Sequence, residues 1–439
     1  MLRKGRRRAD SLRAVRQRLT QWLATAHPAV FAGFAIASAF STYFCMYAFR
    51  KPFSAAAWDG EIWGLKLKIA LIISQILGYA LSKFIGIKAV SEVERSKRAL
   101  VLLGLVGVAQ LALVAVGLLP PAGKVVAMFF NGLPLGMVWG LTFSFLEGRK
   151  TSEFLGAGMS TSYIVASGQV KAVGKWLMDD VGVPEAWMPA TTGLLFALPF
   201  VLAVYLLSSL PPPTQADEAA RTHRDAMDGA ARKSFFWQFA PGLTFLTILY
   251  VVLTAFRDFR DNFQVDIFTE IGMTEAKALA QTENYVAVIV LAVLAAIFLV
   301  KNNRAAFFLI HGVMIVGAVL VGTATLAYQA GMLDGFWWFT LVGTGLYLAY
   351  VPFGCVLFDR LIAASRTVAT SVFMIYVTDA MGYAGSVGIQ LYKNFFAPDR
   401  TWLSFFLTFS YATAAVCTVM FVASALYFTQ RLRPSTDDG

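Results

Sequence analysis

Two arginines stand inside apolar segments of this chain, one in each half. Arg50 lies beside Lys51 in the stretch YFCMYAFRKPF, residues 43–53, and Arg257 lies in LTAFRDFR, residues 253–260. A charged side chain at membrane depth costs roughly 2.5–3.5 kcal/mol on insertion scales, so such residues point to function. The guanidinium group stays protonated and presents a planar fork of donors that matches phosphate or carboxylate oxygens. The two arginines are therefore candidate ligands for an anion.

The residues around the two arginines repeat in the same register. Each arginine follows Ala-Phe, and the flanking polar positions recur at i, i+4, i+7 and i+11, which share one face of an α-helix. The first set is Tyr43, Tyr47, Arg50 and Ser54, and the second is Tyr250, Thr254, Arg257 and Asp261. The repeat predicts equivalent helices that carry a polar face in each half of the chain.

The composition indicates a membrane protein. Of 439 residues, 58% are hydrophobic and 14% are charged, against about a quarter charged in soluble domains. Apolar runs of roughly 20 residues, each long enough to cross a bilayer, recur along the chain. We predict an all-α protein of two pseudo-symmetric six-helix bundles, with twelve spans at about residues 31–55, 64–86, 98–119, 124–147, 155–178, 187–209, 241–267, 284–301, 305–328, 335–358, 367–392 and 402–427.

Polar segments divide the chain and orient it. The expected parts are a basic cytoplasmic tail, an N-terminal bundle, a cytoplasmic linker, a C-terminal bundle and a second tail, at residues 1–27, 28–210, 211–238, 239–428 and 429–439. Lysine and arginine gather in alternate loops, as the positive-inside rule requires. This pattern and the net charge of +11 predict a multi-pass protein of a bacterial inner (cell) membrane with both termini in the cytoplasm.

The twelve spans and central linker resemble the major facilitator superfamily, and one motif resembles its organophosphate:phosphate antiporters. The pattern Tyr-x-x-x-Tyr-x-x-Arg-Lys-x-Phe of their first span is filled by Tyr43, Tyr47, Arg50, Lys51 and Phe53. Their glycine-rich eleventh span is echoed by DAMGYAGSVG, residues 379–388. The resemblance implies that Arg50 and Arg257 grip the phosphate of the substrate at the interface between the halves.

The chain departs from the antiporter pattern in two places near the site. The functional histidine of span five is absent, and Tyr163 stands at about that position. Pro52 follows the Arg-Lys pair where the antiporters usually carry another residue. The chain therefore resembles an outlying branch of that family.

Other polar residues in the spans complete the candidate site. Lys51, Tyr163 and the tyrosines and threonine of the repeat are expected to bind substrate. We expect coupling or gating roles for Asp261, Asp379, Lys171, Lys175 and Glu283, with a contact between Lys175 and Glu283 where spans five and eight meet. A structural alternative stays open, in which Arg257 pairs with Asp261 at i, i+4 and Asp379 neutralises Arg50.

Three functions fit these residues. The first is secondary transport of a small anionic solute, in particular a phosphorylated one, by alternating access, with exchange against inorganic phosphate as one mode. The second is proton-coupled symport of a carboxylated solute, with Asp261 and Asp379 as proton carriers. The third is a transporter-like sensor. No phosphate-binding Gly-x-x-x-x-Gly-Lys-Ser loop or helical His-Glu-x-x-His metal motif occurs, so we expect no enzyme, cofactor, metal or nucleic-acid partner, and a monomer in the lipid bilayer.

Overall fold

The computed structural model describes residues 2–149, 151–215, 217, 237–365 and 371–432. Within this part the chain is almost entirely helical, and most of the linker expected at residues 211–238 lies outside it. Nine of the described helices are long and apolar enough to cross a membrane. These helices make the chain a multi-pass membrane protein.

The N-terminal half holds six of the expected spans. Its elements are α1 (Leu2–Thr25), α2 (Pro28–Tyr47), the 3-10 turn η1 (Pro52–Ala55), β1 (Glu61–Ile62), β2 (Leu65–Lys66), α3 (Leu67–Glu92), α4 (Arg98–Leu118), α5 (Pro121–Leu135), α6 (Val138–Phe143), α7 (Ser152–Asp179) and α8 (Met188–Ser208). The second span is longer than expected, because α3 runs to Glu92 and the predicted span ends at residue 86. Two other spans differ in form from the expectation. The first span ends its helix at Tyr47, and the fourth is divided into α5 and α6.

The C-terminal half holds the other six spans. Its elements are α11 (Ala240–Asn262), α12 (Gln264–Glu270), α13 (Ala276–Phe298), α14 (Asn303–Gln329), α15 (Gly335–Cys355), α16 (Leu357–Ser365), α17 (Ser371–Phe395) and α18 (Trp402–Arg431). Each predicted span overlaps at least one of these helices, but the seventh is divided into α11 and α12, and α13 begins at Ala276 although the eighth span is predicted from residue 284. The predicted all-α architecture is confirmed.

Proline explains why the first span stops early. Pro52 has no N–H to donate, and its ring clashes with the carbonyl that precedes it by four residues in a helix. The α2 helix accordingly ends at Tyr47, residues 48–51 form a turn, and η1 begins at Pro52 itself. The prediction that Arg50 and Ser54 continue the helical face of Tyr43 and Tyr47 is therefore wrong, whereas Arg257 does lie in an unbroken helix, α11.

Glycines bring α3 and α5 into close contact. A Cβ atom on Gly132 would stand 2.2 Å from the carbonyl oxygen of Gln75, and one on Gly78 would stand 2.2 Å from that of Phe129. Contacts this short leave room only for glycine, and small residues commonly allow such approach between membrane helices. Gly78 and Gly132 therefore set the short distance between the two helices.

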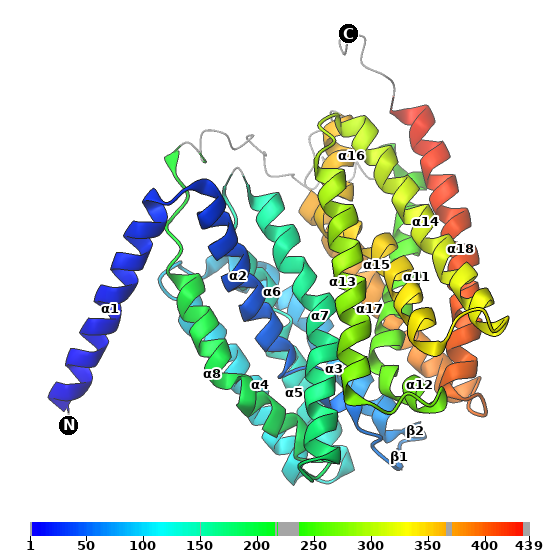
Figure 1. Cartoon of the computed structure of the whole chain (residues 1–439), viewed down its shortest axis with the longest axis horizontal. Helices are drawn as coiled ribbons and strands as arrows, with labels where there is room; N and C mark the ends of the chain where they lie inside the picture. The colour runs from blue at the N-terminus through cyan, green and yellow to red at the C-terminus, as the bar shows by residue number, and fades with distance from the viewer. Residues whose placement is uncertain (1, 150, 216, 218–236, 366–370, 433–439) are drawn as a thin grey trace.

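The two bundles lie side by side, and the β1–β2 hairpin and α12 lie at one end of them, opposite α16 (Figure 1). We call this the hairpin end. Several contacts between the bundles gather toward it. Asn394 of α17 accepts a hydrogen bond from the Lys66 N–H and donates one to the Gly64 carbonyl, and Lys68 pairs with Asp266 at 2.6 Å. The bundles are therefore joined at the hairpin end.

Candidate functional site

Arg50 is a buried cation to which no carboxylate of the described residues is paired. It lies in the turn after α2, is 8% exposed, and stacks its guanidinium over the Tyr79 ring at 4.0 Å from the centroid. Its Nε atom has no hydrogen-bond partner, and no ion pair forms with it in the described part of the chain. A cation over a tyrosine face gains about 0.5–2 kcal/mol, which is less than an ionic partner would supply. Arg50 is therefore available to an anion.

Arg257 occupies the matching place in the other bundle, but it is paired. Its Nη2 and Nε atoms contact Asp258 Oδ1 at 2.7 and 3.0 Å, and the group stacks over the Tyr350 ring at 4.5 Å. It also donates a hydrogen bond to the Tyr350 hydroxyl. The alternative in which Arg257 pairs with Asp261 is wrong. Asp258 is the partner because Asp261 faces the other bundle, and Ser386 holds Asp258 with a hydrogen bond of 2.6 Å.

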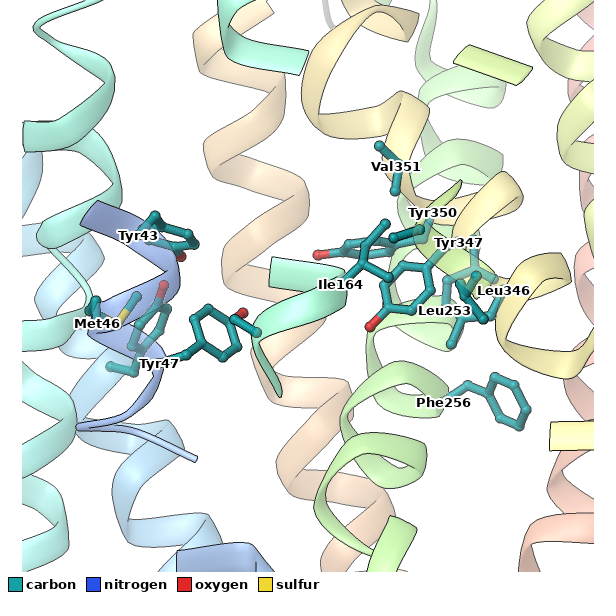
Figure 2. Packing of buried hydrophobic residues seen from close by; sticks show 14 of the residues in the cluster. Tyr43, Met46, Tyr47, Ile164, Leu253, Phe256, Leu346, Tyr347, Tyr350 and Val351 are labelled. Carbon is teal, nitrogen blue, oxygen red and sulfur yellow. The ribbon is translucent and has the colours of Figure 1, made fainter. Parts of the chain in front are cut away.

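Tyrosines from both bundles surround the two arginines. The rings contact one another in pairs, with centroids 5.2–6.5 Å apart. Figure 2 shows Tyr43 and Tyr350 reaching from α2 and α15 toward the space between the bundles. We call the set the tyrosine cluster, and it consists of Tyr43, Tyr47, Tyr79, Tyr163, Tyr250, Tyr347, Tyr350 and Tyr383. Its hydroxyls can donate to an anion, and its ring faces can pack on an organic solute.

Asp379 pairs within this region with a residue other than Arg50. Its carboxylate lies 3.6 Å from Lys83 Nζ and accepts a hydrogen bond from the Tyr250 hydroxyl. Lys83 belongs to α3 and Asp379 to α17, so the pair joins the two bundles. The alternative in which Asp379 neutralises Arg50 is therefore wrong, because the Asp379 carboxylate pairs with Lys83 instead.

Asp261 holds two lysines of the opposite bundle. It pairs with Lys51 at 2.5 Å and with Lys171 at 2.9 Å, and it accepts a hydrogen bond from Ser167. Lys51 also donates to Asn262 at 2.9 Å, and Lys171 donates to Gln264 at 2.6 Å. We call Asp261, Lys51 and Lys171 the bridging triad. It connects the arginine region to the hairpin end.

The expected contact between Lys175 and Glu283 does not form. Lys175 pairs with Asp179 at 2.6 Å, one turn along its own helix, and Glu283 pairs with Arg260 at 2.8 Å. Helices α7 and α13 do pack together as predicted: a Cβ atom on Gly168 of α7 would stand 2.7 Å from the Glu283 side chain. Lys171 rather than Lys175 reaches across, because it lies one turn deeper and is fully buried.

The remaining predicted residues also lie in this region. Thr254 is buried, with its hydroxyl oxygen 2.9 Å from the position of a Cβ on Gly382. Tyr163 of α7 packs against Tyr347 of α15 with ring centroids 6.5 Å apart. Ser54, the last position of the first repeat, donates its hydroxyl to the Lys51 carbonyl at 2.9 Å. The structure therefore brings most of the predicted substrate residues together, whereas Lys51 pairs with Asp261 of the other bundle.

Several residues of the site were not predicted. The i, i+4 pair of Tyr79 and Lys83 on α3 and the i, i+3 pair of Tyr347 and Tyr350 on α15 are polar or aromatic at helical spacing, which is the signal that could have found them. Asp258 and Tyr383 show the same spacing, four residues after Thr254 and Asp379. In the described residues no group of three or more histidine, cysteine or acidic side chains could hold a metal ion.

Comparison with solved structures agrees with the fold. A bacterial homologue of the human lysosomal transporter Spinster, solved inward-facing and unoccupied, is 11% identical, with a TM-score of 0.61 over 94% of this chain and 100% of that chain. A D-xylose–proton symporter is 13% identical, with a TM-score of 0.59 over 93% and 99%. A peptide transporter in complex with alafosfalin is 14% identical, with a TM-score of 0.60 over 95% and 99%. These likenesses show a fold of the major facilitator type.

Comparison of the sequence gives a family without an assigned activity. No curated protein matches the chain. A family model described as a family of unknown function, DUF5690, matches residues 52–431. The match covers most of the chain and includes Arg257, the tyrosines of α3, α7, α11, α15 and α17, and the bridging residues Lys171 and Asp261. The chain belongs to this family of unknown function, DUF5690.

Proposed function

We propose that this protein is a secondary transporter of a small anionic organic solute, in particular a phosphorylated one, which it exchanges for inorganic phosphate by alternating access. The observation that carries the proposal is the unpaired Arg50. Its guanidinium stacks over the Tyr79 ring, and that ring contacts Tyr383 of the bundle that holds Arg257. The Arg-Lys motif of the organophosphate:phosphate antiporters supports the same assignment.

The charge balance of the region supports an anionic ligand. Lys83 and Arg257 are offset by Asp379 and Asp258, whereas Arg50 is offset by no acidic group in the described residues. A buried charge without a partner is costly. An anion that binds Arg50 removes that cost and gains charge-assisted hydrogen bonds, which are about twice as strong as neutral ones. Substrate binding therefore compensates for the buried charge.

The contacts between the bundles support alternating access. In this fold a substrate site between two bundles opens to one side at a time as the bundles rock. The bridging triad and the Lys68–Asp266 pair join the bundles toward the hairpin end. We assign the structure to a state closed at the hairpin end, and these ion pairs must separate when that end opens.

The orientation in the membrane follows from the loop charges. Loops at the end opposite the hairpin are rich in lysine and arginine, so this end is proposed to face the cytoplasm of a bacterial cell. Reporter enzymes fused within residues 211–238 and after residue 432 are expected to give a cytoplasmic signal. A fusion at Gly60, in the hairpin, provides the opposite control. A periplasmic signal from the linker would contradict the orientation.

The proton-coupled and sensor alternatives make different demands. Proton-coupled symport requires carboxylates that are released to accept protons, and both Asp261 and Asp379 are engaged by lysine in this state. The pairing therefore favours exchange over symport. A sensor would bind the same anion without transporting it. A measurement of transport, rather than of binding affinity, therefore distinguishes a sensor from a transporter.

The proposal is tested with purified protein in two steps. The first step is a thermal-shift screen against phosphate, sugar phosphates, glycerol phosphates and carboxylates. Phosphate compounds are expected to stabilise the protein, and a ligand at 100 times its Kd adds about 2.7 kcal/mol to the free energy of unfolding. Proteoliposomes loaded with phosphate should then take up the labelled best ligand, while empty vesicles should not. Uptake driven only by a pH gradient would support symport, and binding without uptake would support a sensor.

A further inference from the structure

The break in the first span leaves the backbone carbonyls of Phe49 and Arg50 without helical partners. In a continuous helix the N–H groups of Phe53 and Ser54 would donate to the carbonyl oxygens of Phe49 and Arg50. Here the Ser54 N–H donates to the Lys51 oxygen at 3.1 Å, and the chain turns into η1. An unsatisfied carbonyl inside a membrane costs several kcal/mol, because no water is present to bond it. The break therefore needs donors from elsewhere.

Two buried amides supply those donors. Asn131 Nδ2 of α5 donates to the Phe49 oxygen at 2.9 Å, and Gln75 Nε2 of α3 donates to the Arg50 oxygen at 2.9 Å. The amides also bond each other, from Gln75 Nε2 to Asn131 Oδ1 at 2.7 Å. Gln75 is 4% exposed and Asn131 is fully buried. Together the two side chains replace the missing helical hydrogen bonds.

The close packing of α3 and α5 fixes the amides in place. Gly132, directly after Asn131, lets the α5 backbone approach the Gln75 carbonyl so closely that a Cβ atom would stand 2.2 Å from it. Asn131 is further held by its bond to the Ala109 oxygen of α4, at 3.1 Å. The conformation of the turn is therefore fixed by the close contact of three helices and does not depend on the local backbone preference of residues 48–51 alone.

The anchored turn sends two neighbouring cations in different directions. The Arg50 guanidinium lies over Tyr79, near the tyrosine cluster, while the Lys51 ammonium reaches Asp261 and Asn262 of the other bundle. By contrast, Arg257 lies in unbroken helix and is oriented by Asp258. The guanidinium group of an arginine without an ionic partner must be oriented by other contacts.

We infer that Gln75 and Asn131 are positioning residues for the anion: they hold the broken backbone so that Arg50 presents its guanidinium to the ligand. The inference rests on the proposed function, in which Arg50 binds the anion. Neither amide is expected to touch the ligand itself. Their effect on affinity must therefore pass through Arg50.

The test is a double-mutant cycle read with inorganic phosphate as the probe. Gln75→Leu and Asn131→Leu are each expected to weaken phosphate binding about tenfold, the loss of roughly one net hydrogen bond. In an Arg50→Lys background the same changes should weaken it less than twofold, because lysine lacks the planar fork whose direction the turn fixes. A purely structural role would give equal losses in both backgrounds and would overturn the inference.

A matched control and a second readout keep the result decisive. Gln110 of α4 also donates its amide to a backbone oxygen of another helix, that of Ala190 at 2.9 Å, and this hydrogen bond does not involve the backbone of the turn. Gln110→Leu should leave phosphate affinity within twofold. Hydrogen exchange of residues 48–56 should accelerate in Gln75→Leu and not in Gln110→Leu. If the wild type binds no phosphate compound, the proposed function is wrong. The hydrogen-exchange result then decides by itself whether the two amides stabilise the turn. Unchanged exchange in Gln75→Leu would show that they do not.

Discussion

Replacing Arg50 with lysine is expected to weaken the binding of inorganic phosphate by about 10- to 100-fold and to leave folding nearly unchanged. Lysine keeps the charge and can still lie over the Tyr79 ring, but it loses the planar fork that bonds two oxygens at once. Hydrogen bonds to charged groups contribute about 1.5–3 kcal/mol each, which sets the size of the loss. Calorimetric titration gives the affinity, and thermal unfolding without ligand gives the stability.

Arg304 provides a matched control for this substitution. It also stacks over an aromatic ring, that of Phe308 at 5.6 Å, and its Nε atom is also buried without a partner. It lies at the start of α14, away from the tyrosine cluster. Arg304→Lys should therefore leave phosphate affinity unchanged. Equal affinity in wild type and Arg50→Lys, or equal losses in both variants, would contradict the assignment of Arg50 as the anion ligand.

Arg257→Lys is expected to weaken binding less than Arg50→Lys does. Arg257 already bonds Asp258 through two nitrogen atoms, so part of its donor capacity is used in the absence of ligand. The Arg257→Ala/Asp258→Ala double variant removes a neutral pair and tests whether that pair is structural only. Full affinity in this double variant would restrict the anion site to Arg50 and its tyrosines.

Replacing Asp261 with asparagine is expected to open the hairpin end. The change removes the one carboxylate that Lys51 and Lys171 share at 2.5 and 2.9 Å and leaves two ammonium groups facing each other where Lys171 is only 1% exposed. Removing one partner of a buried ion pair typically costs about 3–5 kcal/mol. That cost falls on the closed state and is relieved when the bundles separate, so the population should shift toward the open state.

The shift can be measured as a distance between the bundles. Spin labels on Asp180→Cys and Glu275→Cys, both exposed near the hairpin end, should report a longer distance in Asp261→Asn than in the parent, with the native cysteines replaced in both. Asp179→Asn is the control, because it breaks the partly exposed Lys175–Asp179 pair within one helix. Such pairs contribute about 0–1 kcal/mol. Identical distance distributions in all three proteins would refute the role of the bridging triad.

The sequence by itself determined the membrane class, the twelve spans and the residues that had to be explained. Apolar runs long enough to cross a bilayer leave little choice but helices, because a backbone in lipid must satisfy its own hydrogen bonds. Arg50 and Arg257 stood out for the same reason, since a charge at that depth is costly. The early end of α2 was also within reach of the sequence, because Pro52 cannot continue a helix.

Only the tertiary structure decided which charges are paired. Asp258 and Asp261 both lie within about one turn of Arg257 in the same expected helix, and Asp379 lies in another helix, so spacing along one helix could not assign their partners. Their partners depend on how two rigid bundles meet: Lys51, Lys171 and Lys83 approach from the other half of the chain and take Asp261 and Asp379. Among the described residues Arg50 is left without a carboxylate, because ion pairing depends on distances of a few ångströms between helices far apart in sequence.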